Sequence, residues 1–393
     1  MPVIDCFSFG KDRVRAGRPM FAISLCALIC WLAMLQDTES LARNGADPVL
    51  FFLSPLGDDQ WSGTLPSPNS NGTDGPWATL KHARDVVRKQ RLAGQSDQPL
   101  RIRLRGGRYE LAEPLVFLPE DSGTATSPTI FEAYQNEFPI LSGGRRVTGW
   151  KHSEHGDWHV ELSEAKGGGW PIRHVSVDGE WRSRPRLPRK GHFTMAGLAG
   201  ADPSARYDTP ANRFEYSGGD IDPAWTNLPN VEVVVLHFWV DSHLKVASID
   251  AASRTVTLDR FSRRRFTDDY KSTPARYYVQ NVFEVMEPGD FYLNEAAGRL
   301  HYRPREGESV DRTEVVVPRL NDLIEFRGDP GEGKLVEHVT FRGITFSDTV
   351  YEPPGKDAVD GQAEFSSRRD RWSGCPALLD RGLPAAKPRR LCD

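Results

Sequence analysis

The sequence predicts an all-β solenoid that begins with one capping helix, and three observations support this prediction. A short apolar strand starts at Phe51 and leads into a loop rich in turn-forming residues, 54–76. One helix-like segment, HARDVVRKQR at 82–91, follows that loop. Short strand-like runs then follow one another with no helical pattern between them. A solenoid needs such an entrance, because its open end would otherwise expose core side chains and unpaired backbone groups.

Composition limits the classes of protein to which this chain can belong. Its 393 residues are 38% hydrophobic and 26% charged, which is typical of a globular chain with one large domain or two ordinary ones. The formal net charge of -4 gives no reason to expect nucleic acid or an anionic membrane as a partner, because both favour a basic surface. The 35 Gly and 29 Pro are scattered, which favours many tight turns between short strands.

The segment 1–42 has the pattern of a secretory signal peptide. Basic residues precede an uncharged apolar run at 20–35, and the small residues Ser40 and Ala42 follow it. A membrane anchor is the alternative, but a run of 16 residues is shorter than the ~20 that span the hydrocarbon of a bilayer. We therefore predict cleavage near Ala42, a secreted or periplasmic product, and no membrane contact after cleavage.

Residues 43–374 contain no cysteine. A large exported fold has enough core to be stable without disulfide bonds, so we predict neither a disulfide framework nor a structural zinc. Asp58 and Asp59 in the entrance loop carry oxygen ligands of the kind that calcium binds. Two carboxylates without further acids at a set spacing are a weak signal, and we expect them to cap turns. No metal is therefore predicted.

The segment 48–149 is predicted to form the cap and the first rungs of the solenoid. We expect the helix to start at Pro76, with Asp74 or Gly75 as its N-cap, and to end at Gly94. Its apolar face consists of Trp77, Leu80, Ala83 and Val87. Strand-like runs follow at 102–104, 109–111, 115–118, 129–133 and 140–141. Their periodicity alone allows a β-sandwich nearly as well.

The pattern of short strands stops near residue 150 and resumes near 311. Between them, long loops, the apolar run VEVVVLHFWV (231–240) and hairpin-like pairs of runs predict an inserted β-rich domain at 150–310. Resumed rungs are predicted at 311–365, where FRG occurs at 326–328 and again at 341–343. That offset is too short to establish a repeat by itself.

Eight motifs between about 48 and 365 form a specific set. They are SPLGDDQWSG (54–63), GTDGPWATLKHARDVVR (72–88), LRGGRYEL (104–111), PEDSGT (119–124), ILSGGRRVTGW (140–150), RYYVQNVFE (276–284), PGDFYLNEAAGRLHY (288–302) and VEHVTFRGITFSDT (336–349). Together they resemble the N-terminal half of bacterial right-handed parallel β-helix proteins grouped with glycoside hydrolase family 141 and, more loosely, family 120. The resemblance implies a right-handed parallel β-helix in a secreted enzyme that acts on plant or algal polysaccharide without a cofactor.

The resemblance also implies where catalysis would take place. Glycoside hydrolysis uses two carboxyl groups, about 5 Å apart for retention or roughly 6.5 to 9.5 Å apart for inversion. In the resembled enzymes the catalytic acids lie on rungs C-terminal to about Asp348. The acids of this stretch form no recognisable pair by spacing, so the catalytic residues stay unknown and we expect a solvated loop. These acids are Asp348, Glu352, Asp357, Asp360 and Glu364.

The tail at 366–393 differs sharply from the sequence before it. It is rich in Arg and Pro, contains Cys375 and Cys392, and lacks any β-branched residue. We hypothesise a frameshift or early stop near Phe365, with the C-terminal rungs missing. The alternative is a natural tail that caps the solenoid end. If rungs are missing, the last one exposes strand edges, and we expect self-association through the open end of the β-helix.

The strand around Trp239 supplies the candidates for substrate binding. His237, Trp239, Asp241 and His243 alternate along the chain, so on one extended strand they share a face, and the Trp239 ring can stack on a sugar. We predict His237, Trp239 and Asp241 as substrate-binding residues; an ordinary domain contact is the alternative. The basic segments at 145–150 and 182–190 either meet uronic acids of an acidic polysaccharide or form solvated loops.

Three functions agree with these observations, and each has a polysaccharide or oligosaccharide as its partner. The first is a secreted β-helix protein related to polysaccharide-degrading glycoside hydrolases but lacking its catalytic rungs. The second is a non-catalytic carbohydrate-binding or surface protein. The third is a polysaccharide lyase, in which a calcium ion and a basic residue remove a proton beside a uronate.

Overall fold

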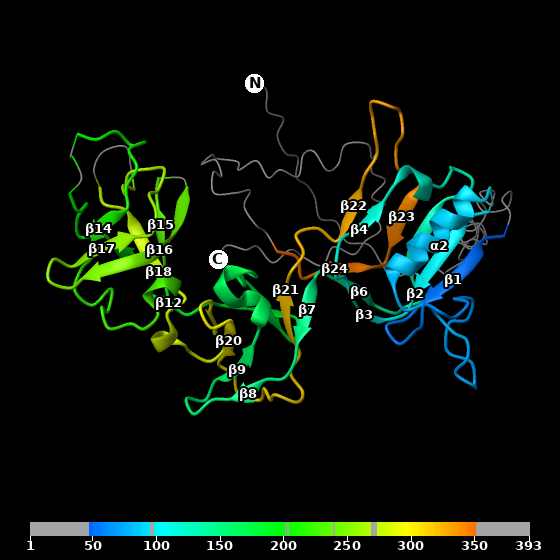
Figure 1. Cartoon of the computed structure of the whole chain (residues 1–393), viewed down its shortest axis with the longest axis horizontal. Helices are drawn as coiled ribbons and strands as arrows, with labels where there is room; N and C mark the ends of the chain where they lie inside the picture. The colour runs from blue at the N-terminus through cyan, green and yellow to red at the C-terminus, as the bar shows by residue number, and fades with distance from the viewer. Residues whose placement is uncertain are drawn as a thin grey trace, which may run out of the picture. The chain divides into compact units, whose positions relative to one another are not determined.

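The computed structural model describes residues 47–94, 98–200, 202, 204–238, 240–268 and 273–350 (Figure 1). The predicted leader at 1–42, the predicted tail at 366–393 and Trp239 lie outside these ranges. Within them, the chain consists of β-strands and one α-helix, α2 (Leu80–Leu92). The prediction of an all-β protein is therefore confirmed. No helix in the described ranges is long and apolar enough to cross a membrane.

Three sheets in the described ranges are parallel, and the chain visits them in a fixed order. The first contains β1 (Val49–Leu53), β2 (Leu100–Leu104), β5 (Thr129–Ala133) and β23 (Val339–Arg342). The second contains β3 (Gly107–Glu110), β6 (Pro139–Ser142) and β24 (Thr345–Ser347), and the third contains β4 (Leu115–Phe117) and β22 (Ile324–Phe326). After β1 the chain passes through β2, β3 and β4, then β5, β6 and β22, then β23 and β24, each pass in parallel register with the previous one.

Aromatic side chains from successive passes stack in the core of these parallel sheets. Phe117 in β4 stacks on its register partner Phe326 in β22, with ring centroids 5.5 Å apart. Phe131 in β5 stacks on Phe341 in β23 at 5.1 Å. The two FRG motifs therefore lie in different sheets, and their offset is the step from one sheet to the next. Register partners in successive passes both carry Phe, although they share no longer motif, because stacking in the core requires only the ring.

The capping helix starts later than predicted, so the expectation of a start at Pro76 was wrong. Thr79 is the N-cap, because its hydroxyl accepts a hydrogen bond from the backbone N–H of His82 at 3.1 Å. Asp59 fixes this cap: its carboxylate accepts hydrogen bonds from the Thr79 N–H at 2.9 Å and the Thr79 hydroxyl at 2.6 Å. The residues before the cap are drawn into extended backbone, where Trp77 bridges to Leu53 in parallel.

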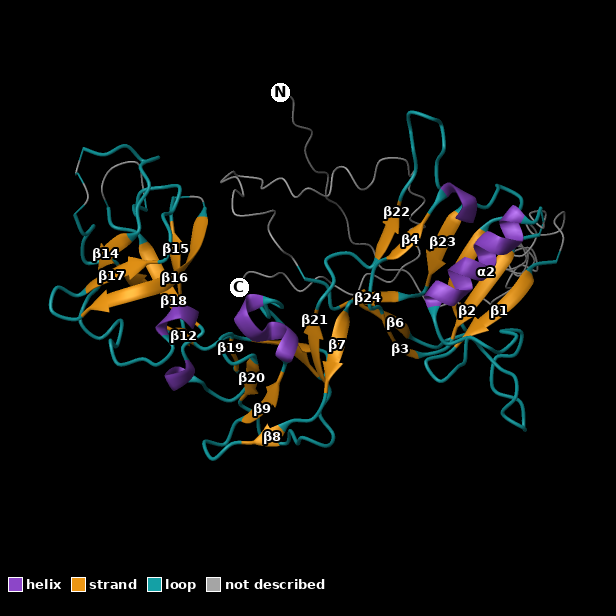
Figure 2. Ribbon diagram, viewed as in Figure 1, coloured by secondary structure: helices purple, strands orange, loops and turns teal. Residues whose placement is uncertain are grey.

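The helix α2 lies beside β1 and β2 (Figure 2), and its apolar residues join the core of the parallel sheets as predicted. Leu80, Ala83 and Val87 are buried in the same core as the inward side chains of β1 and β2. Trp77 joins this core from outside the helix and stacks on Phe51, with ring centroids 4.5 Å apart. One helix thus seals the apolar interior at the strand with which the sheets begin.

The remaining sheets of the described ranges are antiparallel and lie between β6 and β22 in the sequence. One contains β7 (Gly144–Val147), β10 (Val175–Val177), β11 (Glu180–Arg182) and β21 (Val315–Pro318). Another contains β8 (Lys151–His152), β9 (Trp158–Glu161), β19 (Phe291–Asn294) and β20 (Arg299–Tyr302). The largest contains β12 (Arg186–Leu187), β13 (Phe193–Thr194), β14 (Arg213–Glu215), β15 (Glu232–Leu236), β16 (Asp241–Asp250), β17 (Thr255–Leu258) and β18 (Arg276–Gln280). Short 3-10 helices span Pro119–Asp121, Ser163–Gly168, Leu228–Asn230 and Phe283–Val285.

The apolar run at 231–240 does not form one strand, which corrects the geometry expected for the candidate site. β15 ends at Leu236 and β16 begins at Asp241, and these two residues pair across an antiparallel hairpin. The His237 N–H donates to the Val240 carbonyl at 2.8 Å and closes the turn. The chain reverses between β15 and β16. His237 follows the end of β15 and Asp241 begins β16, so these two residues do not share the face of a single strand.

Candidate functional site

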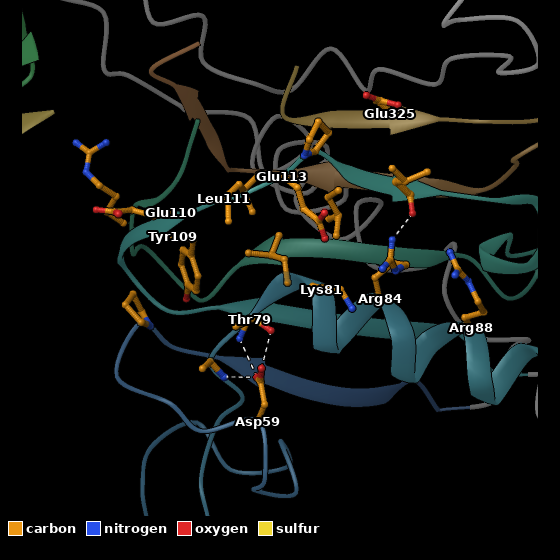
Figure 3. Close-up of a pocket in the computed structure, with 18 of the residues that line it drawn as sticks. Asp59, Thr79, Lys81, Arg84, Arg88, Tyr109, Glu110, Leu111, Glu113 and Glu325 are labelled. Atoms are coloured by element: carbon orange, nitrogen blue, oxygen red, sulfur yellow. Dashed lines mark hydrogen bonds between the residues drawn. The ribbon is translucent and has the colours of Figure 1, made fainter. Parts of the chain in front are cut away.

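A pocket of about 1070 Å³ lies beside α2 in the parallel region (Figure 3). Thr79, Lys81, Arg84 and Arg88 of the helix and its cap line one wall, and the segment 108–118 lines the other. The lining mixes charged side chains with apolar ones such as Leu111 and Leu115.

The charged groups of this pocket are largely committed to the protein itself. Arg88 forms two hydrogen bonds to the buried carboxylate of Asp121, at 2.9 and 2.6 Å. Arg84 donates to the Val116 carbonyl. Asp59 caps turns as expected: besides Thr79 it accepts from the Ala78 N–H at 2.9 Å. The pocket therefore offers few free hydrogen-bonding groups to a ligand.

Asp348 is the one acid of the predicted catalytic stretch that the structure describes. Its carboxylate is buried and accepts hydrogen bonds from Arg108 and from the Ser142 hydroxyl, the latter at 2.6 Å. It ties β24 to β3 and β6, so its position is structural rather than that of a solvated loop. The other acids, at 352–364, lie outside the described residues.

The predicted substrate-binding residues do not form one group. His237 is buried, and its ring nitrogens lie 2.9 Å from the Arg265 carbonyl and 2.9 Å from the Ser242 hydroxyl, so it holds the hairpin turn. Asp241 is more than half exposed and lies at the start of β16, 3.7 Å from the imidazole of His243. Trp239 lies outside the described residues. Whether any of them binds substrate stays a prediction.

Asp241 and His243 belong to a polar cluster centred on the buried carboxylate of Glu232. His243 Nδ1 lies 3.4 Å from Glu232, and Arg184 Nη1 donates to Glu232 at 2.8 Å. Arg173 Nη1 lies 4.0 Å away. The antiparallel pairing of β15 with β16 and β18 creates this arrangement, because it places residues of alternate positions on the face opposite the apolar core.

The charged groups of this cluster shift one another's pKa values. Burial alone would lower the pKa of His243, but the carboxylates of Asp241 and Glu232 outweigh it and raise this pKa to about 9. Burial alone would raise the pKa of Glu232, but His243 and Arg184 hold it well below its ordinary value. At neutral pH the cluster therefore holds a charged imidazolium beside charged carboxylates.

Sequence reasoning missed Glu232, Arg184 and Tyr278 as members of this cluster. One signal was present: Glu232 is a lone acid within an otherwise apolar strand, and a buried acid needs cationic partners. Those partners come from segments far apart in the sequence. Arg184, for example, lies 48 residues before Glu232. Arg186 adjoins the cluster through Tyr278: its guanidinium carbon lies 3.9 Å from the centroid of the Tyr278 ring.

The basic segment at 182–190 is not a solvated loop. Arg182 is buried and bonds to Tyr302 and Glu308, at 3.0 and 2.9 Å. Arg189 bonds to Asp290 at 2.6 Å. These two cations are structural, whereas Arg184 and Arg186 belong to the polar cluster.

The pKa values of the described carboxyl groups bear on general-acid catalysis. A glycosidase acid has a raised pKa. Each described carboxyl group whose pKa departs from its ordinary value departs downward, because hydrogen-bond donors and cations outweigh burial. No group of three or more His, Cys, Asp or Glu residues within the described ranges is arranged to hold a metal ion.

Comparison with known proteins yields one informative likeness. No family profile and no curated protein matches the chain. A solved structure titled "Glycoside hydrolase" has a TM-score of 0.64 and 26% sequence identity, covering 78% of this chain and 51% of that one. The chain thus spans about half the length of that structure. The complex of XylC with xylose has a TM-score of 0.31 at 11% identity over 77% of this chain and 35% of that one, too low to indicate a shared fold.

A bacteriophage AP22 tailspike, gp54, in complex with Acinetobacter baumannii capsular saccharide was also found, with a TM-score of 0.15 at 9% identity over 53% of this chain and 24% of that one. This value, too, is too low to indicate a shared fold. The likeness with a TM-score of 0.64 therefore shows that the fold of this chain is like that of a glycoside hydrolase.

Proposed function

We propose that the chain is an exported right-handed parallel β-helix protein, related to glycoside hydrolases of the family 141 type, that recognises polysaccharide. The observation that carries this proposal is the likeness to a glycoside hydrolase, with a TM-score of 0.64 and 26% identity over 78% of this chain. The ordered passage of the chain through three parallel sheets supports the solenoid. The pairing of β7 with β21 supports an inserted β-rich domain at about 150–310, since it brings the two ends of that segment together.

Recognition without cleavage is the form of this function that the described residues favour. The pKa values of Glu232 and Asp241 lie below their ordinary values, so both carboxyl groups are charged at neutral pH, which does not suit proton donation to a leaving group. Hydrolysis and β-elimination are the two rival forms, and each leaves a distinct product.

Binding and cleavage can be tested on the same protein. The full chain would be run in native gels containing single polysaccharides, both neutral and acidic, and incubated with each of them in solution. We expect retarded migration in at least one gel, with no new reducing ends. Reducing ends without ultraviolet absorbance would instead support hydrolysis, and ultraviolet-absorbing unsaturated products would support elimination. Unretarded migration in every gel, without products, would overturn the proposal.

A further inference from the structure

The polar cluster around Glu232 continues onto the segment that contains β10 and β11. Arg173 and Arg184 reach Glu232 from the two ends of this segment. Burial and the positive charges of Arg173 and Arg184 lower the pKa of His174. The His174 ring in turn meets the Trp181 ring edge to face, with centroids 5.8 Å apart. Because Arg173 is the chain neighbour of His174, we treat Trp181 and the cations around Glu232 as one surface.

Cations outnumber carboxylates on this surface. Arg173, Arg184, Arg186 and His243 are its cationic members, and together with Trp181 we call them the cationic surface. The carboxylates that face them are those of Glu232 and Asp241. Because the surplus is positive, a ligand that brings its own negative charge gains more here than a neutral one.

Arg173 has the most capacity left to bind a ligand. Its side chain is 42% exposed, and its ion pair with Glu232, at 4.0 Å, is too long for a hydrogen bond. Arg184 is less exposed and uses one terminal nitrogen on Glu232, while its Nε has no hydrogen-bond acceptor among the described residues. An arginine fork that is not already paired is the group best suited to hold a carboxylate through two parallel hydrogen bonds.

Trp181 gives the cationic surface a flat apolar face. Trp181 is 51% exposed. An indole has more apolar area to bury than most side chains, and here much of that area faces water. The ring packs edge to face on His174, the chain neighbour of Arg173, so it does not lie within an apolar patch. A sugar ring suits it better than a purely hydrophobic partner, because its C–H face stacks on the indole while its polar edge reaches the neighbouring donors.

From this combination we propose that the cationic surface binds an acidic saccharide, with a uronate carboxylate on Arg173 and a sugar ring stacked on Trp181. The inference rests on the proposed function and narrows it to carboxylate-bearing glycans. Nucleic acid is the other polyanion to consider, but the net charge of -4 opposes general attraction of long polyanions, so a local surface with a stacking ring favours the saccharide.

The test compares binding of galacturonan oligosaccharides, of neutral xylan oligosaccharides and of single-stranded DNA to the full chain by isothermal titration calorimetry. We expect the galacturonan to bind, the xylan to bind at least tenfold more weakly, and Arg173→Ala or Trp181→Ala to weaken galacturonan binding tenfold or more. Binding should also weaken as salt is raised, because exposed charges are screened.

Matched controls separate this site from general electrostatics. Arg103 also lies on a carboxylate that several cations share, that of Glu132, at 3.1 Å, but in the parallel region. Phe138 is an exposed aromatic residue outside the cationic surface. We expect Arg103→Ala and Phe138→Ala to change galacturonan binding less than twofold. Circular dichroism spectra of all variants should match that of the parent chain.

Each other outcome has a distinct meaning. Binding of xylan alone would overturn the acidic-saccharide inference and leave the proposed function standing. If native gels with a wide panel of polysaccharides also show no retention, the proposed function itself fails. Equal losses with Arg103→Ala and Arg173→Ala, or DNA binding as tight as galacturonan binding, would show a general polyanion effect and overturn the site. Galacturonan binding that survives both Arg173→Ala and Trp181→Ala would place the saccharide elsewhere.

Discussion

Two carboxylates, Glu132 in the parallel region and Glu232 in the antiparallel region, are each surrounded by cations, yet their surroundings differ. Arg101, Arg103 and Arg342 lie 3.4, 3.1 and 3.9 Å from Glu132. All of them come from strands of the same parallel sheet, so the cluster links neighbouring strands. Around Glu232, Arg173 and Arg184 come from the loops on either side of β10 and β11, and the third cation, His243, comes from the neighbouring strand β16.

This difference shows that ion pairs around a carboxylate can serve two purposes in one protein. Around Glu132 the arginines follow from strand register and lie above a closely packed aromatic core, so they add to an assembly that apolar packing already holds. Around Glu232 the cations join separate segments and adjoin an exposed tryptophan, so they fix a surface. We therefore expect the parallel region to depend most on its core, and the antiparallel region to depend more on its ion cluster.

The largest effect is expected from the aromatic core beneath Glu132. Phe131→Ala removes a fully buried ring that contacts Phe117 and Phe341, and we expect it to lower the free energy of unfolding by about 4 kcal/mol in urea titrations. Phe138→Ala, at a residue that is 80% exposed, should change it by less than about 0.5 kcal/mol. Equal effects of the two substitutions would contradict the stacked core.

Glu232→Gln should have the next largest effect. The amide keeps the shape of the side chain but leaves the partly buried Arg184 and the charged His243 without their shared counter-ion. We expect a loss of about 3 kcal/mol, measured by urea unfolding at neutral pH. A loss below that of the corresponding change at Glu132 would break the comparison between the two clusters.

Glu132→Gln should be milder, at about 1 kcal/mol in the same measurement. The side chains of its arginine partners are a third to a half exposed, so water solvates them when the carboxylate is neutralised. A loss as large as that of Phe131→Ala would show that the ion cluster, rather than the aromatic core, holds these strands together.

The smallest effect is a pH dependence confined to the Glu232 cluster. The pKa of His243 is raised from 6.5 to about 9, so its contribution to stability is fully present below pH 6.5 and is lost as the pH rises through about 9. Glu232, Asp241, Arg184 and Tyr278 are the charged or titratable groups near it. We expect the unfolding midpoint to fall over this window in the parent chain and to fall less in His243→Asn. Parallel curves for the two proteins would refute the coupling.

Some of the architecture could be predicted from local patterns. The strand runs at 102–104 and 129–133 and the apolar face of α2 were correct, because alternation and helical spacing depend only on neighbours in the chain. The start of α2 was not, because a favourable Pro at 76 lost to the contact of Asp59 with Thr79, whose partners lie twenty residues apart. The turn between β15 and β16 was missed for a similar reason. It interrupts a run that looks like one strand, and it forms because β15 pairs with β16.

For the described residues, the sequence by itself determined an all-β fold with one capping helix, and it placed rings at the positions that stack. Such features follow from short-range periodicity and from the size of single side chains. Only the tertiary structure decided which charges meet. Arg173, Arg184 and His243 converge on Glu232 because antiparallel pairing and a folded-back segment bring together residues that are far apart in the chain. Electrostatic neighbours are set by long-range contacts, and no local pattern records them.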